Sequence, residues 1–268
     1  MNATQAGDTI ALRTGLAWSL FGVWYRHVRV YCKTFLANAT PAVLEPLFFF
    51  AAVALGLGTY MPQMQFEGLP YATYVASGVL AGSAMFTAVF ETTYGTFVRL
   101  AYQHTYDAML GTHLRTSEMF AGEMLFCASK GAVFATIVVL VTFVFGVRPT
   151  IWCLLVPVVG AVTGYLWAAV GLIITSYVKM INNFSFFTTG IITPVFFFSG
   201  TFFPVRGHYA VLDVITLFVP LTPSIELSRA LFKAQFTGVT LLSLGLLAVY
   251  TVLFHFIALR RMTKRVLR

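Results

Sequence analysis

The sequence predicts an all-α membrane protein folded as a single domain over residues 1–268. Of its 268 residues, 59% are hydrophobic and only 10% are charged, whereas a soluble domain carries about 25% charged residues. The mean hydropathy is +0.84. A helix needs about 20 mostly apolar residues to cross the hydrocarbon core of a bilayer. Six segments meet this requirement, and together they predict a six-span bundle within residues 41–259: residues 41–60, 71–93, 124–146, 151–177, 184–203 and 239–259.

Basic residues stand directly beside the apolar segments. The net charge is +8, and basic side chains crowd the tail over residues 260–268. Such flanks are typical of cytoplasmic segments that meet the anionic leaflet, so membrane lipid is the expected partner and nucleic acid is not. An even number of spans places both termini on one side, and the basic residues gather on that side. Both termini are therefore predicted to be cytoplasmic.

The segment over residues 12–36 has the pattern of an amphipathic helix. At about 100° per residue, its apolar side collects Leu16, Leu20, Val23, Tyr31 and Phe35, and its basic side collects Arg26, Arg29 and Lys33. His27 falls on the apolar side and departs from the pattern. A helix of this kind suits the inner membrane interface. The alternative is a basic flank that only fixes topology.

The predicted cytoplasmic loop over residues 99–120 mixes charged and apolar residues. Thr105 is placed to cap a short helix and Gly111 to end it. We expect the side chains of this helix to be exposed and to dock in a groove of a cytoplasmic partner: Tyr106, Asp107, Met109 and Leu110. The alternative is a solvated turn with a frayed helix.

Familiar catalytic and ligand-binding motifs are missing from the sequence. It has no G-x-x-x-x-G-K-[ST] phosphate loop, no H-E-x-x-H, no G-x-S-x-G, and no C-x-x-C among its three cysteines. In each motif, the spacing brings together the side chains or backbone groups that bind a phosphate, bind a metal or carry out catalysis. We therefore expect no catalytic residue, no metal site and no cofactor bound by this chain.

Ionisable residues within membrane spans indicate function by default. Here they are Glu45, Glu91 and Lys130, each near the inner end of its predicted span. That position favours structural pairing or partner contact over proton coupling. An ion- or proton-coupled secondary transporter, the alternative from another class, would show mid-membrane carboxylates and inverted repeats.

The fifth span ends in an unusual run, FFFSGTFFPV, over Phe196 to Val205. Ser199-Gly200 and Pro204 interrupt it, and non-helical backbone in lipid must be covered by protein or line a cavity. Five side chains here are candidates for a substrate path, with helix packing as the alternative: Phe197, Phe198, Ser199, Phe202 and Phe203. The two G-x-x-x-G pairs, Gly78/Gly82 and Gly160/Gly164, are expected to pack within the chain, with a dimer contact as the alternative.

A second sequence pattern follows the fifth span. The Ser-Gly-x-Phe-Phe-Pro run is followed by a Pro-x-[ST]-Pro-like turn at Pro220–Pro223 and by a helix bearing Glu226 and Arg229. This combination resembles the type 2 ABC transporter permease family, and most closely the branch that exports lipo-chitooligosaccharide nodulation factors. The resemblance makes Gly200, Pro204, Pro220, Pro223, Glu226 and Arg229 the structural signature. Glu226 and Arg229, three apart on a helix, are expected to pair.

The resemblance implies a transport subunit rather than an enzyme. Two permease copies would join two cytoplasmic ATPase subunits, which would bind ATP and Mg. The loop helix at about residues 105–112 would be the coupling helix, and re-entrant outer helices would lie between spans five and six. The cargo would be a lipid-linked oligosaccharide, glycolipid or similar amphipathic molecule moved outward across a bacterial inner membrane. Drug-exporting permeases share these features.

Overall fold

The computed structural model describes residues 15–35, 40, 44, 48–49, 51–57, 65–144, 150–204, 216 and 218–267. Within these ranges the chain is nearly all helical, as predicted, apart from one two-stranded hairpin. Among the described residues, five helices are long and apolar enough to cross a membrane: residues 71–101, 116–143, 151–177, 181–201 and 238–266. Half of the predicted span at 41–60 lies outside the described residues, so the sixth span stays a prediction.

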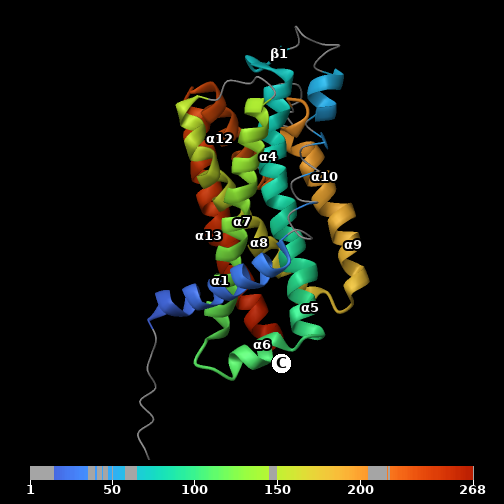
Figure 1. Ribbon diagram of the computed structural model, residues 1–268, viewed down its shortest axis with the longest axis vertical. Coiled ribbons are helices and arrows are strands. Elements are labelled where there is room, and N and C mark those ends of the chain that lie inside the picture. The colour runs from blue at the N-terminus through green and yellow to red at the C-terminus, as the bar shows by residue number, and fades with distance from the viewer. Residues whose placement is uncertain are drawn as a thin grey trace, which may run out of the picture.

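The five long helices stand side by side in one bundle, with the C-terminus and the short helix α6 at one end and strand β1 at the other (Figure 1). We call these the α6 end and the hairpin end. The elements are α1 (Leu16–Lys33), η1 (Ala52–Leu57), β1 (Gln65–Phe66), β2 (Leu69–Pro70), α4 (Tyr71–Phe90), η2 (Glu91–Gly95), α5 (Thr96–Ala101), α6 (Thr105–Leu110), α7 (Thr116–Val144), η3 (Ile151–Leu155), α8 (Val156–Tyr177), η4 (Ile181–Asn183), α9 (Phe184–Phe187), η5 (Thr188–Ile192), α10 (Thr193–Phe196), η6 (Phe197–Thr201), α12 (Thr222–Lys233) and α13 (Gly238–Val266).

Small residues let the central helices approach closely. A Cβ placed on Gly164 would lie 2.7 Å from the Cys127 carbonyl oxygen of α7. A Cβ on Gly78 of α4 would lie 2.7 Å from Thr201, and one on Gly82 would overlap the Phe196 ring. Both G-x-x-x-G pairs are therefore used in packing within the chain, as predicted.

A tight β-hairpin, formed by β1 and β2, lies at the hairpin end of the bundle, opposite α6. Gln65 pairs with Pro70 and Phe66 with Leu69, and the two turn residues, Glu67 and Gly68, have φ of 51° and 77°. Positive φ at both central residues is the mark of a type I′ turn, whose twist matches that of the strands. The hairpin leads directly into α4 and places Glu67 beside α12, which ends in Lys233.

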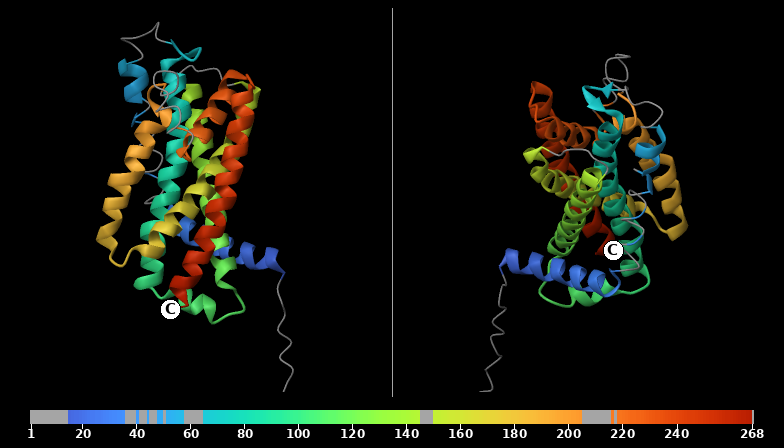
Figure 2. Two further views of the ribbon diagram at one scale, coloured as in Figure 1. Left: turned by 180° about the vertical axis from the view of Figure 1, so that it is seen from behind. Right: turned by 45° about the horizontal axis from the view of Figure 1, so that its top comes forward.

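Helix α1 crosses the α6 end of the bundle at a steep angle to the long helices (Figures 1 and 2). Val23 and His27 are buried against α7, where the His27 ring stacks on Phe126 with 5.4 Å between centroids. The Trp24 Nε1–H donates to Ser129 Oγ over 2.9 Å. Leu16, Trp18, Phe21 and Tyr25 stay exposed. Helix α1 (Leu16–Lys33) lies within the predicted segment 12–36, and its place in the membrane interface stays a prediction. His27 departs from the apolar pattern because it packs on the protein.

The seat of α1 on α7 depends on one glycine. A Cβ on Gly122 would lie 2.7 Å from the Val23 Cβ and 3.2 Å from the Leu20 carbonyl oxygen. We expect Gly122→Ala to lower the free energy of unfolding by about 1–3 kcal/mol, as overpacking does. Gly22→Ala is the matched control, because a Cβ there meets nothing within 4 Å. Thermal unfolding in detergent checks this, and equal midpoints for the two variants would contradict the close contact.

Candidate functional site

A buried charge network joins the loop helix to three other elements at the α6 end. Its members are Glu91 in η2, Arg99 in α5, Tyr106 in α6, and Glu123 and Lys130 in α7. Arg99 Nη1 lies 2.8 Å from Glu91 Oε1, and Lys130 Nζ lies 2.8 Å from Glu91 Oε2. Arg99 also pairs with Glu123, which is fully buried. Two cations therefore face two carboxylates, and the network is neutral.

The local helix geometry supplies further partners. Segment η2 is a π-helix, and π-turns leave carbonyl groups outside the usual i→i−4 pattern. The Glu91 carbonyl accepts from Arg99 Nη2 over 3.3 Å. The hydroxyl of Thr96 donates to Glu123 Oε1. Buried charges persist when they are paired and hydrogen-bonded, and each member of this network meets that condition.

Tyr106 ties α6 to the network, and this corrects the expectation that its side chain is exposed. It is fully buried and packs on Phe120, with 5.4 Å between ring centroids. Its hydroxyl donates to Glu123 Oε2 over 2.8 Å and accepts from Arg99 Nε over 3.3 Å. Burial raises the pKa of this phenol well above its usual range, so it stays a donor at any physiological pH. Tyr106 therefore holds the helix from inside.

The remaining side chains of α6 divide between surface and interior. Asp107 is exposed, while Met109 and Leu110 are half-buried. The helix begins differently from the prediction: the N-cap is His104, with φ of 48°, and Thr105 is the first helical residue. His104 Nδ1 lies 3.0 Å from Asp107 Oδ2, which closes the first turn in place of a threonine cap. Gly111 ends the helix, as predicted.

The interrupted fifth span lies at the hairpin end. Gly200 has φ of 87°, a conformation that costs a residue with a Cβ roughly 1–2 kcal/mol. Its carbonyl accepts from the Tyr74 hydroxyl over 3.1 Å and from Arg229 Nη2. The Arg229 guanidinium lies 3.6 Å from the centroid of the Tyr74 ring and donates to Ser77 Oγ over 3.3 Å. The break is thus covered by protein, as lipid requires.

The expected Glu226–Arg229 pair is wrong. Arg229 Nη1 is 3.9 Å from Glu67 Oε1, and Glu226 accepts a hydrogen bond from Ser243 of α13. Arg229 instead contacts η6 and α4, because the Gly200 carbonyl accepts a charge-assisted hydrogen bond from its buried guanidinium. Pro220 precedes α12, and Pro223 is buried in its first turn, where the missing N–H costs nothing. Pro204 follows the break and is half-buried.

The substrate-path candidates separate into two groups. Phe197, Phe198 and Phe203 are exposed, and Phe202 is half-buried against the Phe196 and Phe197 rings. Ser199 is buried, and its hydroxyl donates to the Phe196 carbonyl over 2.8 Å. A molecule travelling along this helix would meet the phenylalanines and not Ser199.

Arg99 and Glu123 were missed by sequence reasoning. Arg99 lies just after the predicted span at 71–93, and Glu123 lies just before the predicted span at 124–146. The helices continue past those limits, to Ala101 and from Thr116. A signal was present in the charges themselves, since Glu91, Arg99, Glu123 and Lys130 alternate in sign along the two helix ends.

A family model described as ABC-2 type transporter matches residues 19–233. The chain belongs to the ABC-2 type transporter family. The matched region contains the charge network, the span-five break and Arg229. The predicted resemblance is confirmed, and with it the assignment as a multi-pass membrane transport protein.

Individual relatives of this family cover nearly the full chain. Nodulation protein J of Rhizobium leguminosarum bv. trifolii is 31% identical over 98% of this chain and 100% of its own. Nodulation protein J of Rhizobium leguminosarum bv. viciae is 32% identical over 95% of this chain and 96% of its own. Nodulation protein J of Sinorhizobium fredii is 30% identical over 93% of this chain and 95% of its own. The predicted branch of the family is therefore the one that these relatives represent.

Proposed function

We propose that this ABC-2 family member is the permease subunit of an ATP-driven exporter, and that α6 is its coupling helix. The observation that carries the proposal is the attachment of α6 to the long helices through Tyr106, Glu123 and Arg99. A short helix held this way transmits a displacement to the spans instead of bending alone. The chain has no phosphate loop, so two partner ATPase subunits would bind ATP and Mg.

The orientation follows from the placement of charge. The C-terminal end of α13 and helix α1 both lie at the α6 end (Figures 1 and 2). The basic residues of α1 and of the C-terminal tail therefore share that end, which favours a cytoplasmic location for it. We accordingly place both termini and α6 in the cytoplasm and the hairpin end outside, in a bacterial inner membrane.

The transport route would involve a second copy of the permease. The outer faces of span five and α13 carry exposed apolar side chains, among them Phe197, Phe198, Leu241 and Val252. Such faces meet lipid or a second permease. An amphipathic cargo such as a lipid-linked oligosaccharide would travel between two copies along such a surface. The similarity to Nodulation protein J favours this cargo class over a drug.

The exposed face of α6 offers a direct test. We expect Asp107→Arg to abolish copurification with the ATPase subunit, or to uncouple ATP hydrolysis from transport, without loss of membrane insertion. Ser117→Arg is the control, because it adds the same side chain at an exposed position of the same end, outside α6. A deletion of residues 106–110 is less informative, since it would also remove Tyr106 from the core.

The measurements are ATPase activity of the reconstituted complex with and without a candidate glycolipid, and transport of that glycolipid into vesicles. Stimulation and transport that survive in Asp107→Arg would contradict a coupling role for α6. Stimulation by cationic drugs but not by glycolipids would assign the permease to drug export. Transport that needs an ion gradient and no ATPase would overturn the proposal.

A further inference from the structure

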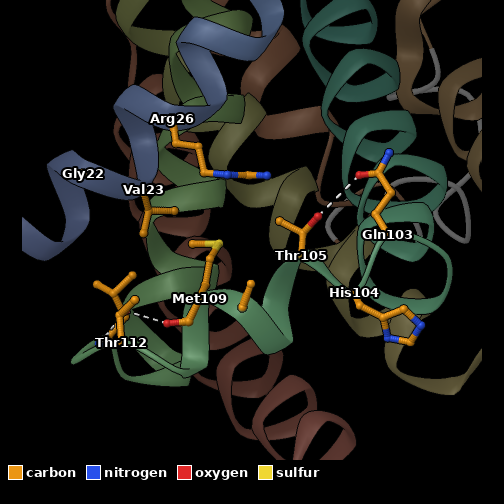
Figure 3. A pocket seen from close by; sticks show the side chains of 10 residues that line it. Gly22, Val23, Arg26, Gln103, His104, Thr105, Met109 and Thr112 are labelled. Carbon is orange, nitrogen blue, oxygen red and sulfur yellow. Dashed lines mark hydrogen bonds between the residues drawn. The ribbon is translucent and has the colours of Figure 1, made fainter.

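Two adjoining pockets lie between α1 and the connection from α5 to α6. One of about 500 Å³ is lined by residues of α1 and of the α6 segment, and one of about 370 Å³ by residues of α1, η2 and α5. Both are lined by Arg26 and Gln103. Figure 3 shows the Arg26 side chain extending from α1 into the space above α6, with Gln103 and Thr105 across from it.

Arg26 brings an additional positive charge to the neighbourhood of the buried charge network. The nearby charge network is already balanced, with Arg99 and Lys130 against Glu91 and Glu123. None of the described residues forms a hydrogen bond or ion pair with the Arg26 guanidinium. Burial, and then the positive charge of Arg99, lower the pKa of Arg26 and outweigh the opposing effects of Tyr106 and Glu123. A half-buried cation in this position attracts an anion from outside the chain.

The other polar walls of the pockets are suited to the same anion. None of the described residues that line the two pockets carries a carboxylate. Gln103 accepts from the Thr105 hydroxyl over 3.4 Å, which leaves its NH₂ group to donate. His27 lines the smaller pocket, is 3% exposed, and its Nε2 has no hydrogen-bond partner in the described ranges. Burial lowers the pKa of His27 to about 4, so its neutral ring supplies one N–H donor.

The surroundings indicate that the anion belongs to a lipid. Val30 and Val98 line the smaller pocket beside the polar groups. Val30, Trp18 and Phe21 are exposed on α1, the helix that lies across the bundle end. Arg29 and Lys33 add positive charge on the same helix. An apolar surface next to a cationic pocket matches the boundary between acyl chains and headgroups.

We propose that this pair of pockets binds the phosphate of an anionic phospholipid from the inner leaflet, with Arg26 as the main ligand and His27 and Gln103 as additional donors. The acyl chains lie along the exposed apolar side of α1. Bound there, the headgroup bridges α1 to the chain that enters α6. Anionic lipid thereby fixes the distance between the interface helix and α6, a role separate from that of the transported cargo.

The test measures the thermal unfolding midpoint of the purified full-length protein in nanodiscs of phosphatidylcholine, with and without phosphatidylglycerol. Both lipids carry a phosphate, but only phosphatidylglycerol has a net negative charge. The expected result is a higher midpoint with phosphatidylglycerol. In Arg26→Gln that rise should largely disappear, and lipid binding measured by native mass spectrometry should weaken about tenfold or more, as loss of a charge-assisted contact predicts.

Arg29→Gln is the matched control, because it removes the same charge from an exposed position of α1 that lines neither pocket. It should keep most of the rise. His27→Phe retains a ring on Phe126 while removing the donor, and should weaken phosphatidylglycerol binding without lowering stability in phosphatidylcholine. Equal losses in Arg26→Gln and Arg29→Gln would reduce the effect to general surface charge and overturn the site. An equal rise with inorganic phosphate alone would assign the pocket to a free anion and overturn the lipid proposal.

Discussion

Replacing Glu123 with alanine is expected to lower the free energy of unfolding by about 3–5 kcal/mol, the usual result of removing one member of a buried ion pair. Among the described carboxylates, the variant leaves Arg99 paired with Glu91 alone, and it removes the acceptor of the Tyr106 hydroxyl. Because Tyr106 anchors α6, the same change should also uncouple ATP hydrolysis from transport. Glu118→Ala, which removes a partly exposed carboxylate five residues earlier in α7, should cost much less.

The chain supplies its own probes for this measurement. Cys127 and Cys153 are buried and Cys32 is exposed. In a Cys32→Ser background, a thiol-reactive dye reports only on opening of the helix bundle. Comparing Glu123→Ala, Arg99→Met and the double variant gives the coupling energy of the pair. The double variant should lose less stability than the sum of the losses of the two single variants. Losses that add up strictly would contradict a direct interaction.

Replacing Arg229 with methionine is the second large change, with an expected loss of about 2–4 kcal/mol, from lost charged hydrogen bonds and altered packing. It removes the donor to the Gly200 carbonyl and the cation above the Tyr74 ring. Lys233→Met is the control. Lys233 Nζ is 3.2 Å from Glu67 Oε2 in a partly exposed pair, and such pairs contribute only about 0–1 kcal/mol.

The same dye measurement applies, and limited proteolysis adds a local readout. In Arg229→Met, cleavage should increase at the hairpin end, at residues 201–204 and 218–222, while the α6 end stays protected. A loss no larger than that of Lys233→Met would show that Tyr74 alone holds the break. Cleavage that rises equally at both ends would indicate global unfolding rather than release of the span-five turn.

The sequence predicted features that depend on composition and repeated spacing. Apolar windows indicated the five spans found among the described residues, and Gly160 and Gly164 indicated close helix packing. Gly200 was recognisable because Ser-Gly followed by Pro204 cannot continue a helix. These properties are local, so a single chain segment carries all the information that is needed.

Features that depend on distant partners were not predictable. The burial of Tyr106 is set by Glu123, which is 17 residues away. Arg229 turns from Glu226 toward a carbonyl 29 residues away. For Tyr106, the polar composition of the loop favoured an exposed side chain. For Arg229, the spacing along the helix favoured Glu226 as the partner. The loss of water at a buried carbonyl or carboxylate outweighed both preferences.

The π-turn at Glu91–Gly95 changes the rotation about the helix axis of the residues that follow it. In an unbroken α-helix, Glu91 and Arg99 would stand about 80° apart around the axis, since eight residues advance about 800°. A π-turn absorbs one residue without advancing the winding, so the two act like residues seven apart, with an azimuthal offset of about 20°. The arginine therefore stands almost directly below the glutamate that it pairs with. The neutral cluster, and the rotational setting of the α5–α6 segment, are consequences of one supernumerary residue in the helix.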